Sequence, residues 1–171
     1  MKSAMPSFTN PNNLSIITGV PPSQTGICGN YFFNRESGEE VMMTSSELLR
    51  CGTILQDLEK NGSRIVVVTA KNKLLQLLTH GLTNCVGFSV ERFDDPIATE
   101  TIQQAKLGVS SVQELMGGRK APHIYDPDCS IYCIEAGLRL IERMQEQSSD
   151  PIMAYLSTTD YVQHKYAPNE P

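Results

Sequence analysis

The chain has 171 residues, which suits one domain, and its 40% hydrophobic and 19% charged residues exclude a wholly disordered protein. A net charge of −5 without a basic cluster leaves no electrostatic footprint for nucleic-acid binding. No apolar run approaches the roughly 18 residues that cross a bilayer, and no apolar segment of signal-peptide length stands near the start, so we expect a cytoplasmic protein without a membrane partner.

The first predicted helix lies close to the start of the chain. Asn10 is a favourable N-cap, Pro11 suits the first helical position, and residues 12–18 can continue helically until Gly19 ends the helix. Thr9 would then lie just outside the helix N-terminus, where unpaired N–H groups and the helix dipole favour an anion or an ionised hydroxyl. Thr9 is therefore a candidate nucleophile, and the alternative is that it only helps to cap the helix.

The next segment predicts a loop, a short strand and a longer helix. Residues 19–30 are rich in turn-forming residues, YFFN at 31–34 is typical of a short strand, and the polar RESGEE at 35–40 is typical of a turn. Residues 44–62 place Ser or Thr before Glu, continue with apolar residues at helical spacing and stop at Asn-Gly. They predict one amphipathic helix.

A βαβ unit follows. RIVVVTA at 64–70 is a continuous β-branched run, which is typical of a parallel strand covered on both faces. KNKLLQLLTHG at 71–81 predicts a helix closed by Gly81, and NCVGFSVE at 84–91 predicts a second buried strand.

The last third of the chain continues this alternation. Residues 97–118 are polar with helical patterning and two glycine breaks, residues 126–151 hold the longest predicted helix, and PIMAYLSTT at 151–159 predicts another buried strand. Strands that alternate with helices indicate an α/β fold with a mostly parallel sheet and helices on both faces. Ligands of such sheets bind beyond the carboxyl ends of the strands.

The five cysteines give no metal or disulfide framework. They are odd in number and mostly scattered, at Cys28, Cys51, Cys85, Cys129 and Cys133. We expect reduced, buried thiols, and no structural zinc site at the last two because no second ligand pair stands nearby.

Four groups of polar residues fall where such a sheet would place a site. They are Thr9, Asn30, the pair Lys71 and Lys73, and Asp160 with His164. Their convergence matters more than any single member, because each has an ordinary structural explanation.

Asp160 and His164 have the i, i+4 spacing that points a carboxylate and an imidazole at one metal ion from a helical turn. The alternative is a solvated surface turn. Lys71 and Lys73 follow a strand and could clamp a substrate carboxylate or phosphoryl group, although solvated lysines are common. Asn30 offers an amide for a phosphoryl oxygen in a glycine-containing loop, or it is an ordinary turn residue.

The chain is similar to the alkaline phosphatase superfamily in three separated segments. They are MPSFTNPNNLSIITGVPPSQTGICGNYFFN at 5–34, TAKNKL at 69–74 and STTDYVQHKYAP at 157–168, and they most closely resemble the phosphonoacetate hydrolase family within it. The resemblance implies an alkaline phosphatase-like three-layer αβα sandwich, incomplete at both ends. Residues 1–171 would form a single partial catalytic domain.

The resemblance also implies roles for the six residues. Thr9 would be the nucleophile and a zinc ligand, Asn30 would hold the phosphoryl group, Lys71 and Lys73 would bind the substrate carboxylate, and Asp160 with His164 would ligate another zinc ion. The implied reaction is hydrolysis of a carbon–phosphorus bond, in which phosphonoacetate and water give acetate and phosphate. The resemblance thus implies a small-molecule phosphonate as the partner and two zinc ions as the cofactor. It leaves open whether the complete protein forms a homodimer.

Two departures from the family pattern lead to a further expectation. Family members carry an aspartate zinc ligand well before the nucleophile, and an Asp-His pair and another His after the DxxxH motif, whereas only eight residues precede Thr9 and seven follow His164. We therefore expect the chain to be part of a longer hydrolase and to be inactive alone. The alternatives are a nucleotide pyrophosphatase or phosphodiesterase of the same superfamily, and an inert α/β domain that binds an anion or a partner.

Overall fold

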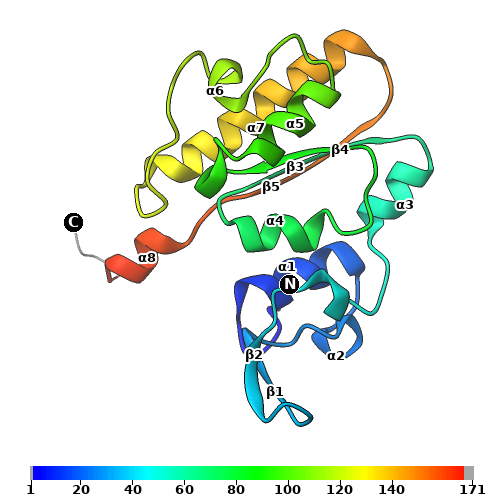
Figure 1. Cartoon of the computed structure of the whole chain (residues 1–171), viewed down its shortest axis with the longest axis vertical. Helices are drawn as coiled ribbons and strands as arrows, with labels where there is room; N and C mark the ends of the chain where they lie inside the picture. The colour runs from blue at the N-terminus through cyan, green and yellow to red at the C-terminus, as the bar shows by residue number, and fades with distance from the viewer. Residues whose placement is uncertain (1, 168–171) are drawn as a thin grey trace.

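The computed structural model describes residues 2–167, so Met1 and residues 168–171 of the predicted single domain lie outside the described residues. Its centre is a three-stranded parallel sheet of β3 (Arg64–Thr69), β4 (Cys85–Ser89) and β5 (Ile152–Ser157), in the order β4-β3-β5 (Figure 1). All three strands were predicted, and their parallel pairing is confirmed. Thr69 lies opposite Ser89 on one side and Ser157 on the other, so the carboxyl ends of the three strands are level.

The unbroken apolar sequence of the central strand β3 results from its burial on both faces of the sheet. Its residues alternate between the two faces: Val66 and Val68 belong to one hydrophobic cluster, while Ile65 and Val67 belong to the other. All four side chains are fully buried, because both faces of the sheet are covered. The edge strand β5 is only half-buried along its whole length.

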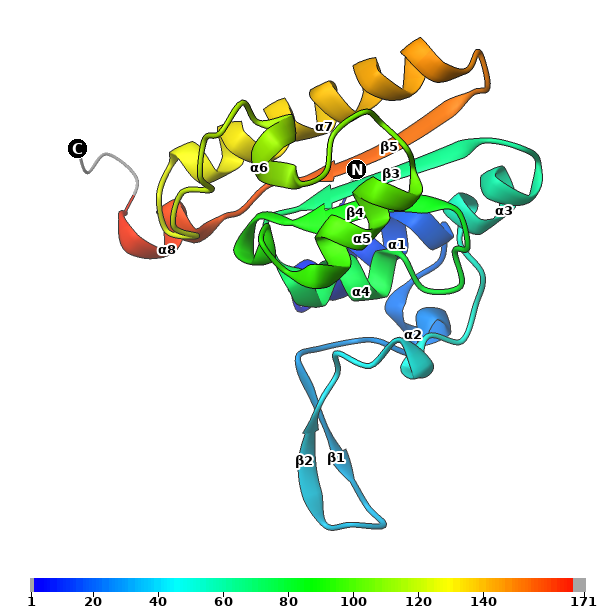
Figure 2. The same cartoon turned by 45° about the horizontal axis from the view of Figure 1, so that its top comes forward.

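Helices cover both faces of the sheet and give the predicted three layers (Figures 1 and 2). On one face, the cluster of Val66 and Val68 includes residues of α5 (Pro96–Gln104), α6 (Val112–Leu115) and α7 (Asp128–Gln147). On the other face, the cluster of Ile65 and Val67 includes residues of α1 (Thr9–Thr18), α3 (Ile54–Lys60) and α4 (Asn72–Leu78).

The long helix α7 approaches β5 closely at Gly137. A Cβ atom on this glycine would lie 2.8 Å from Cδ1 of Leu156, well inside van der Waals contact. The absence of a side chain at Gly137 therefore lets α7 lie against the edge of the sheet, and this helps to fix the end of β5 from which Asp160 follows.

The first helix begins earlier than the sequence predicts. Phe8, and not Asn10, is the N-cap of α1, so Thr9 is the first helical residue rather than a residue outside the helix. Pro11 is still in the first turn, where its missing N–H has no intrahelical partner to lose. The predicted end is confirmed, because Gly19 adopts φ +70° and closes the helix, and the short α2 (Pro22–Thr25) follows.

The segment after α2 forms a β-hairpin, of which only the first strand was predicted. β1 (Tyr31–Asn34) pairs with β2 (Glu39–Met42) in antiparallel register, and the hairpin projects from the rest of the molecule (Figure 2). The predicted turn is therefore too long, because Glu39 and Glu40 are paired with Asn34 and Phe33. Cross-strand pairing overrides the low strand propensity of glutamate.

The predicted helix over residues 44–62 is wrong in its first half. A short 3₁₀ turn at Ser46–Leu48 is followed by extended backbone, and α3 starts only at Ile54. A capping box at Thr53 explains the break: the Thr53 hydroxyl accepts the N–H of Gln56 at 3.2 Å, and the Gln56 side chain accepts the N–H of Thr53 at 3.0 Å. The cap lies directly after Gly52, where a helix is easily interrupted.

We expect Thr53→Ala to lower the free energy of unfolding by about 1 kcal/mol, because it removes a side-chain cap from a helix that packs on the sheet. Urea unfolding followed by circular dichroism measures the change. Ser45→Ala is the matched control, since Ser45 caps only the 3₁₀ turn. Equal losses in the two variants would contradict the role given to Thr53.

Among the described residues, no helix is both long enough and apolar enough to span a bilayer. The five cysteines are free thiols, as expected, but the expected burial holds for Cys129 and Cys133 alone, because Cys51 and Cys85 are partly exposed and Cys28 is exposed. Burial raises the pKa of Cys85 and of Cys133 to about 12, so these two thiols stay protonated at neutral pH.

Candidate active site

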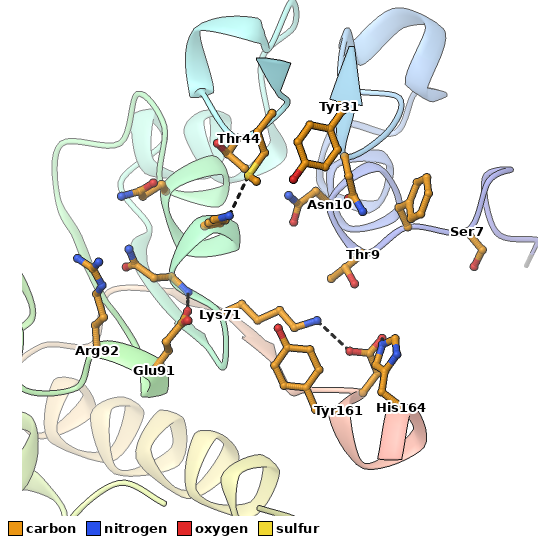
Figure 3. Close-up of a pocket in the computed structure, with 17 residues that line it drawn as sticks. Ser7, Thr9, Asn10, Tyr31, Thr44, Lys71, Glu91, Arg92, Tyr161 and His164 are labelled. Carbon is orange, nitrogen blue, oxygen red and sulfur yellow. Dashed lines mark hydrogen bonds and ion pairs between the residues drawn. The ribbon is translucent and has the colours of Figure 1, made fainter. Parts of the chain in front are cut away.

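A cavity of about 730 Å³ is formed where the carboxyl ends of β3 and β5 meet the start of α1 and the hairpin. All six residues singled out from the sequence line it: Thr9, Asn30, Lys71, Lys73, Asp160 and His164. Figure 3 shows Thr9 and Tyr31 on one side of this cavity, with Lys71, Tyr161 and His164 on the other. The convergence predicted from the parallel sheet is therefore present in the fold.

The position of Thr9 is fixed by Asn13, one turn further along α1. The Asn13 side chain donates to the backbone carbonyl of Thr9 at 2.8 Å and accepts a hydrogen bond from the hydroxyl of Tyr155 at 2.7 Å. Because Tyr155 lies in β5, these two bonds tie the start of α1 to the sheet. The N-cap Phe8 makes no side-chain capping bond, and Thr9 itself is already helical, so the capping alternative for Thr9 is wrong.

Asn30 lies at the base of the hairpin. Its backbone carbonyl accepts the N–H of Met43 at 2.7 Å and closes the end of the hairpin nearest the cavity. Its side chain is exposed to solvent at the cavity wall. An amide there can donate to a ligand without breaking any bond that holds the fold.

Asp160 and His164 lie on one helical turn, as the spacing predicts. Asp160 is the N-cap of α8 (Tyr161–Lys165), and its Oδ2 lies 3.4 Å from Nε2 of His164. Both side chains are more than half exposed and border the cavity. Their oxygen and nitrogen atoms can therefore meet a ligand together.

Lys71 makes the most defined contacts in the site. Its Nζ donates to Oδ1 of Asp160 at 2.9 Å and lies 4.2 Å from the centre of the Tyr161 ring, and its side chain is only 19% exposed. Lys71 follows β3 and Asp160 follows β5, so their meeting is a direct result of the parallel pairing of these two strands. The gathering of Lys71 and Asp160 was predicted, but their direct ion pair was not, because no local pattern relates residues 89 positions apart.

Lys73 contacts a different partner. Its Nζ lies 2.8 Å from Sδ of Met42 on the hairpin strand β2. One lysine therefore contacts α8 and the other contacts the hairpin, and the prediction that both bind one carboxylate stays a prediction.

Glu91 is a cavity residue that the sequence analysis missed. Its carboxylate accepts the backbone N–H of Asn72 at 2.8 Å, at the start of α4. An acidic group there balances the unfavourable position of lysines at the positive end of a helix. Glu91 follows β4 as Lys71 follows β3. A search for polar residues just after every strand of the parallel sheet would therefore have identified Glu91.

Opposing effects act on the Asp160 carboxyl. Partial burial raises its pKa, but the hydrogen bond and the charge of Lys71 outweigh burial and hold the pKa below its ordinary value of 3.8. Asp160 is therefore an anion throughout the neutral range.

We expect a carboxyl-detected NMR titration of the chain to place the Asp160 midpoint below 3.8. Lys71→Met removes the main cause of the lowering and should move the midpoint upward, whereas Lys73→Met should not. The pKa of Asp160 is lower in the folded protein than in the unfolded chain. Ionised Asp160 therefore stabilises the fold at pH values above the unfolded pKa, and this stabilisation is lost as the pH falls through the folded pKa. An unchanged midpoint in Lys71→Met would contradict the role of the ion pair.

The donor set suits zinc only in part. Asp160 and His164 offer a carboxylate and an imidazole, which zinc accepts, and the Thr9 hydroxyl borders the same cavity. Within residues 2–167, no group of three or more His, Cys, Asp or Glu side chains is placed to hold a metal ion. A closed four-ligand zinc site is therefore not formed by the described residues alone.

Comparisons with known proteins show what the chain as a whole is similar to. The family model described as type I phosphodiesterase / nucleotide pyrophosphatase matches residues 1–171. Among solved structures, phosphonoacetate hydrolase from Sinorhizobium meliloti in complex with phosphonoacetate is 43% identical, with a TM-score of 0.81 over 99% of this chain. The structure of that enzyme with phosphonoformate is 44% identical, with the same TM-score. The chain spans 39% of the length of each of these two structures.

Proposed function

The chain belongs to the type I phosphodiesterase / nucleotide pyrophosphatase family, within the alkaline phosphatase superfamily, and we propose that it forms part of a phosphonoacetate hydrolase active site. The observation that carries the proposal is the gathering of six residues from three separated motifs around one cavity. The solved structures with phosphonoacetate and phosphonoformate support the choice of a small phosphonate as substrate.

Thr9 is the proposed nucleophile. Its oxygen attacks phosphorus, a phosphorus–oxygen bond forms, and the electron pair of the broken carbon–phosphorus bond passes to the CH₂ group of the leaving acetate. A proton from water converts that carbon into the methyl group of acetate, and the proton lost by the Thr9 hydroxyl neutralises the hydroxide left behind. A second water molecule then attacks phosphorus, which releases phosphate and restores the Thr9 hydroxyl. Asn30, with its exposed amide, is proposed to donate to a phosphoryl oxygen during both steps.

The lysines are proposed to bind the substrate carboxylate. The leaving group carries a negative charge that spreads from carbon onto the carboxylate as an enolate, so a cation at this carboxylate stabilises the transition state more than the substrate. Lys71 already holds a carboxylate, that of Asp160, at 2.9 Å. Lys73 touches only a neutral sulfur atom through its Nζ in the described part of the chain, so its charge is available to an anion.

Two zinc ions are part of the proposal. Asp160 and His164 would hold one, and Thr9 would bind the other together with ligands outside the described residues. When bound, they would supply positive charge to the oxygen atoms at phosphorus and would favour the ionised form of the Thr9 hydroxyl.

A phosphodiesterase or pyrophosphatase is the second candidate function, because the matching family model carries that description. Such an enzyme would use Thr9 and Asn30 in the same way. It would have no need of Lys71 and Lys73, because its leaving group is an oxygen and carries no carboxylate. An inert domain that binds an anion or a partner is the third candidate, since the charges of Lys71 and Lys73 border the cavity.

Phosphate release from phosphonoacetate with added zinc tests the proposal. We would compare the chain alone with an extended protein, in which the segments of the Sinorhizobium meliloti enzyme that flank the matched region are joined to both ends. Release by the extended protein is the expected result. If the extended protein is folded and loaded with zinc but releases no phosphate, while it cleaves a phosphodiester, the second candidate replaces the first.

A further inference from the structure

A row of aromatic rings runs from a surface loop to the cavity. The rings of Tyr161 and Tyr125 stack with their centres 4.5 Å apart and their planes 16° from parallel. Tyr125 stacks in turn on His123, at 5.7 Å and 22°. At the cavity end of the row, the ammonium group of Lys71 lies 4.2 Å from the centre of the Tyr161 ring. Figure 3 shows Tyr161 beside Lys71 and His164.

We propose that Tyr161 is a positioning residue for Lys71, and that Tyr125 holds the Tyr161 ring in place. A lysine ammonium on a flexible stem has several rotamers, and an aromatic face attracts it through the ring quadrupole. This attraction uses none of the three N–H donors of the ammonium group. Lys71 can therefore exchange one carboxylate partner for another while the ring keeps its Nζ at the cavity wall.

The helix that carries Tyr161 needs such support. α8 has only five residues, and none of them is buried. A helix of this length is not stable by itself, so contacts outside it must fix its side chains. The broad stacking contact with Tyr125 meets this need, because aromatic pairs of this kind resist tilting and sliding of either ring.

The loop that carries Tyr125 is well suited to the task. It lies between Pro122 and Pro127, and the backbone N–H of Tyr125 donates to Nδ1 of His123 at 3.3 Å. The N–H of Asp126 donates to the carbonyl of His123 at 2.8 Å. The two bonds and the flanking prolines define one turn, which presents the Tyr125 ring to α8. His123 thus organises this turn through both its ring and its carbonyl group.

Direct observation of Lys71 by NMR tests the proposal without any reference to activity. Reductive methylation with ¹³C-formaldehyde labels each lysine as a dimethylamine that keeps its charge. Ring currents shift methyl groups above an aromatic face upfield. The Lys71 signal, assigned by its loss in Lys71→Arg, should therefore lie upfield of the signal of Lys60, whose side chain is 74% exposed.

Matched variants distinguish the effect of each aromatic ring from the effect of its hydroxyl group. We expect the upfield shift to survive in Tyr161→Phe and Tyr125→Phe, to vanish in Tyr161→Leu, and to shrink in Tyr125→Leu because the Tyr161 ring is no longer held. Circular dichroism verifies that each variant is folded. A Lys71 signal that coincides with that of Lys60 in the unaltered chain would overturn the proposal, and so would a Tyr125→Leu variant whose Lys71 signal is unchanged.

The consequence for the substrate rests on the proposed function. In the extended protein, Tyr125→Leu should lower kcat/KM for phosphonoacetate about tenfold, with a fall in kcat, because a misplaced Lys71 stabilises the enolate-like transition state less, and Tyr125→Phe should restore it. An equal loss with a phosphodiester that lacks a carboxylate would indicate a general structural defect and would overturn this role. If the extended protein has no activity at all, the proposed function is wrong, and the NMR experiment alone decides on the lysine–ring contact.

Discussion

Thr9→Ala is expected to abolish phosphate release by the extended protein, with kcat lower by roughly 10⁴-fold or more. The variant keeps the helix start, because α1 is capped at Phe8 and Asn13 holds the backbone, not the hydroxyl, of residue 9. The loss would therefore reflect the missing oxygen and not a displaced helix. Stopped and continuous assays of phosphate with saturating phosphonoacetate measure it.

The controls for Thr9 follow from the structure of α1. Thr9→Ser keeps a hydroxyl and should retain most of the activity. Thr18→Ala removes the hydroxyl at the other end of the same helix, which donates to the carbonyl of Leu14, and should leave the rate unchanged. Full activity of Thr9→Ala would rule out Thr9 as the nucleophile.

Removal of both lysine charges is expected to have the second largest effect, and it decides between the two enzymatic candidates. Each charged hydrogen bond to a carboxylate contributes about 1.5–3 kcal/mol, so the double variant Lys71→Met, Lys73→Met should lose roughly 10²- to 10⁴-fold in kcat/KM for phosphonoacetate. Hydrolysis of a phosphodiester that lacks a carboxylate should change little. The measurement is a parallel assay of both substrates.

The methionine stems keep most of the packing of each lysine, so the comparison isolates the charge. Lys60→Met is the matched control, because Lys60 is exposed and only 3.9 Å from Asp57 in a weak surface pair. If both substrates lose activity equally, the lysines support the site in general and do not recognise the carboxylate. If neither substrate loses activity, the proposed role of the pair is wrong.

Much of the fold could be predicted because it depends on local patterns. The run from Ile65 to Val68 is buried on both faces, and this burial is the physical reason for its continuous apolar sequence. The meeting of Lys71 and Asp160 also follows from a general rule, since residues after adjacent parallel strands share one edge of the sheet.

The errors concern features that local patterns do not contain. The strand at Glu39 exists because Asn34 pairs with it, and the helix at Ile54 starts late because Thr53 and Gln56 form a reciprocal capping box there. The contact of Tyr125 with Tyr161 joins a loop to a helix 36 positions later, and no periodicity relates the two. Such contacts depend on how separate elements pack, so they became apparent only in three dimensions.

The ion pair between Lys71 and Asp160 has a thermodynamic consequence for the site as a whole. A cation that binds Asp160 competes with Lys71 for the charge of one carboxylate, and an anion that binds Lys71 competes with Asp160 for one ammonium group. The first ligand to bind weakens the ion pair, and the second then meets a partner that is less engaged. Binding of the two ligands is therefore coupled. The anion raises the affinity of the site for the cation by the same factor by which the cation raises its affinity for the anion, and the affinity for either ligand is lowest when the other is absent.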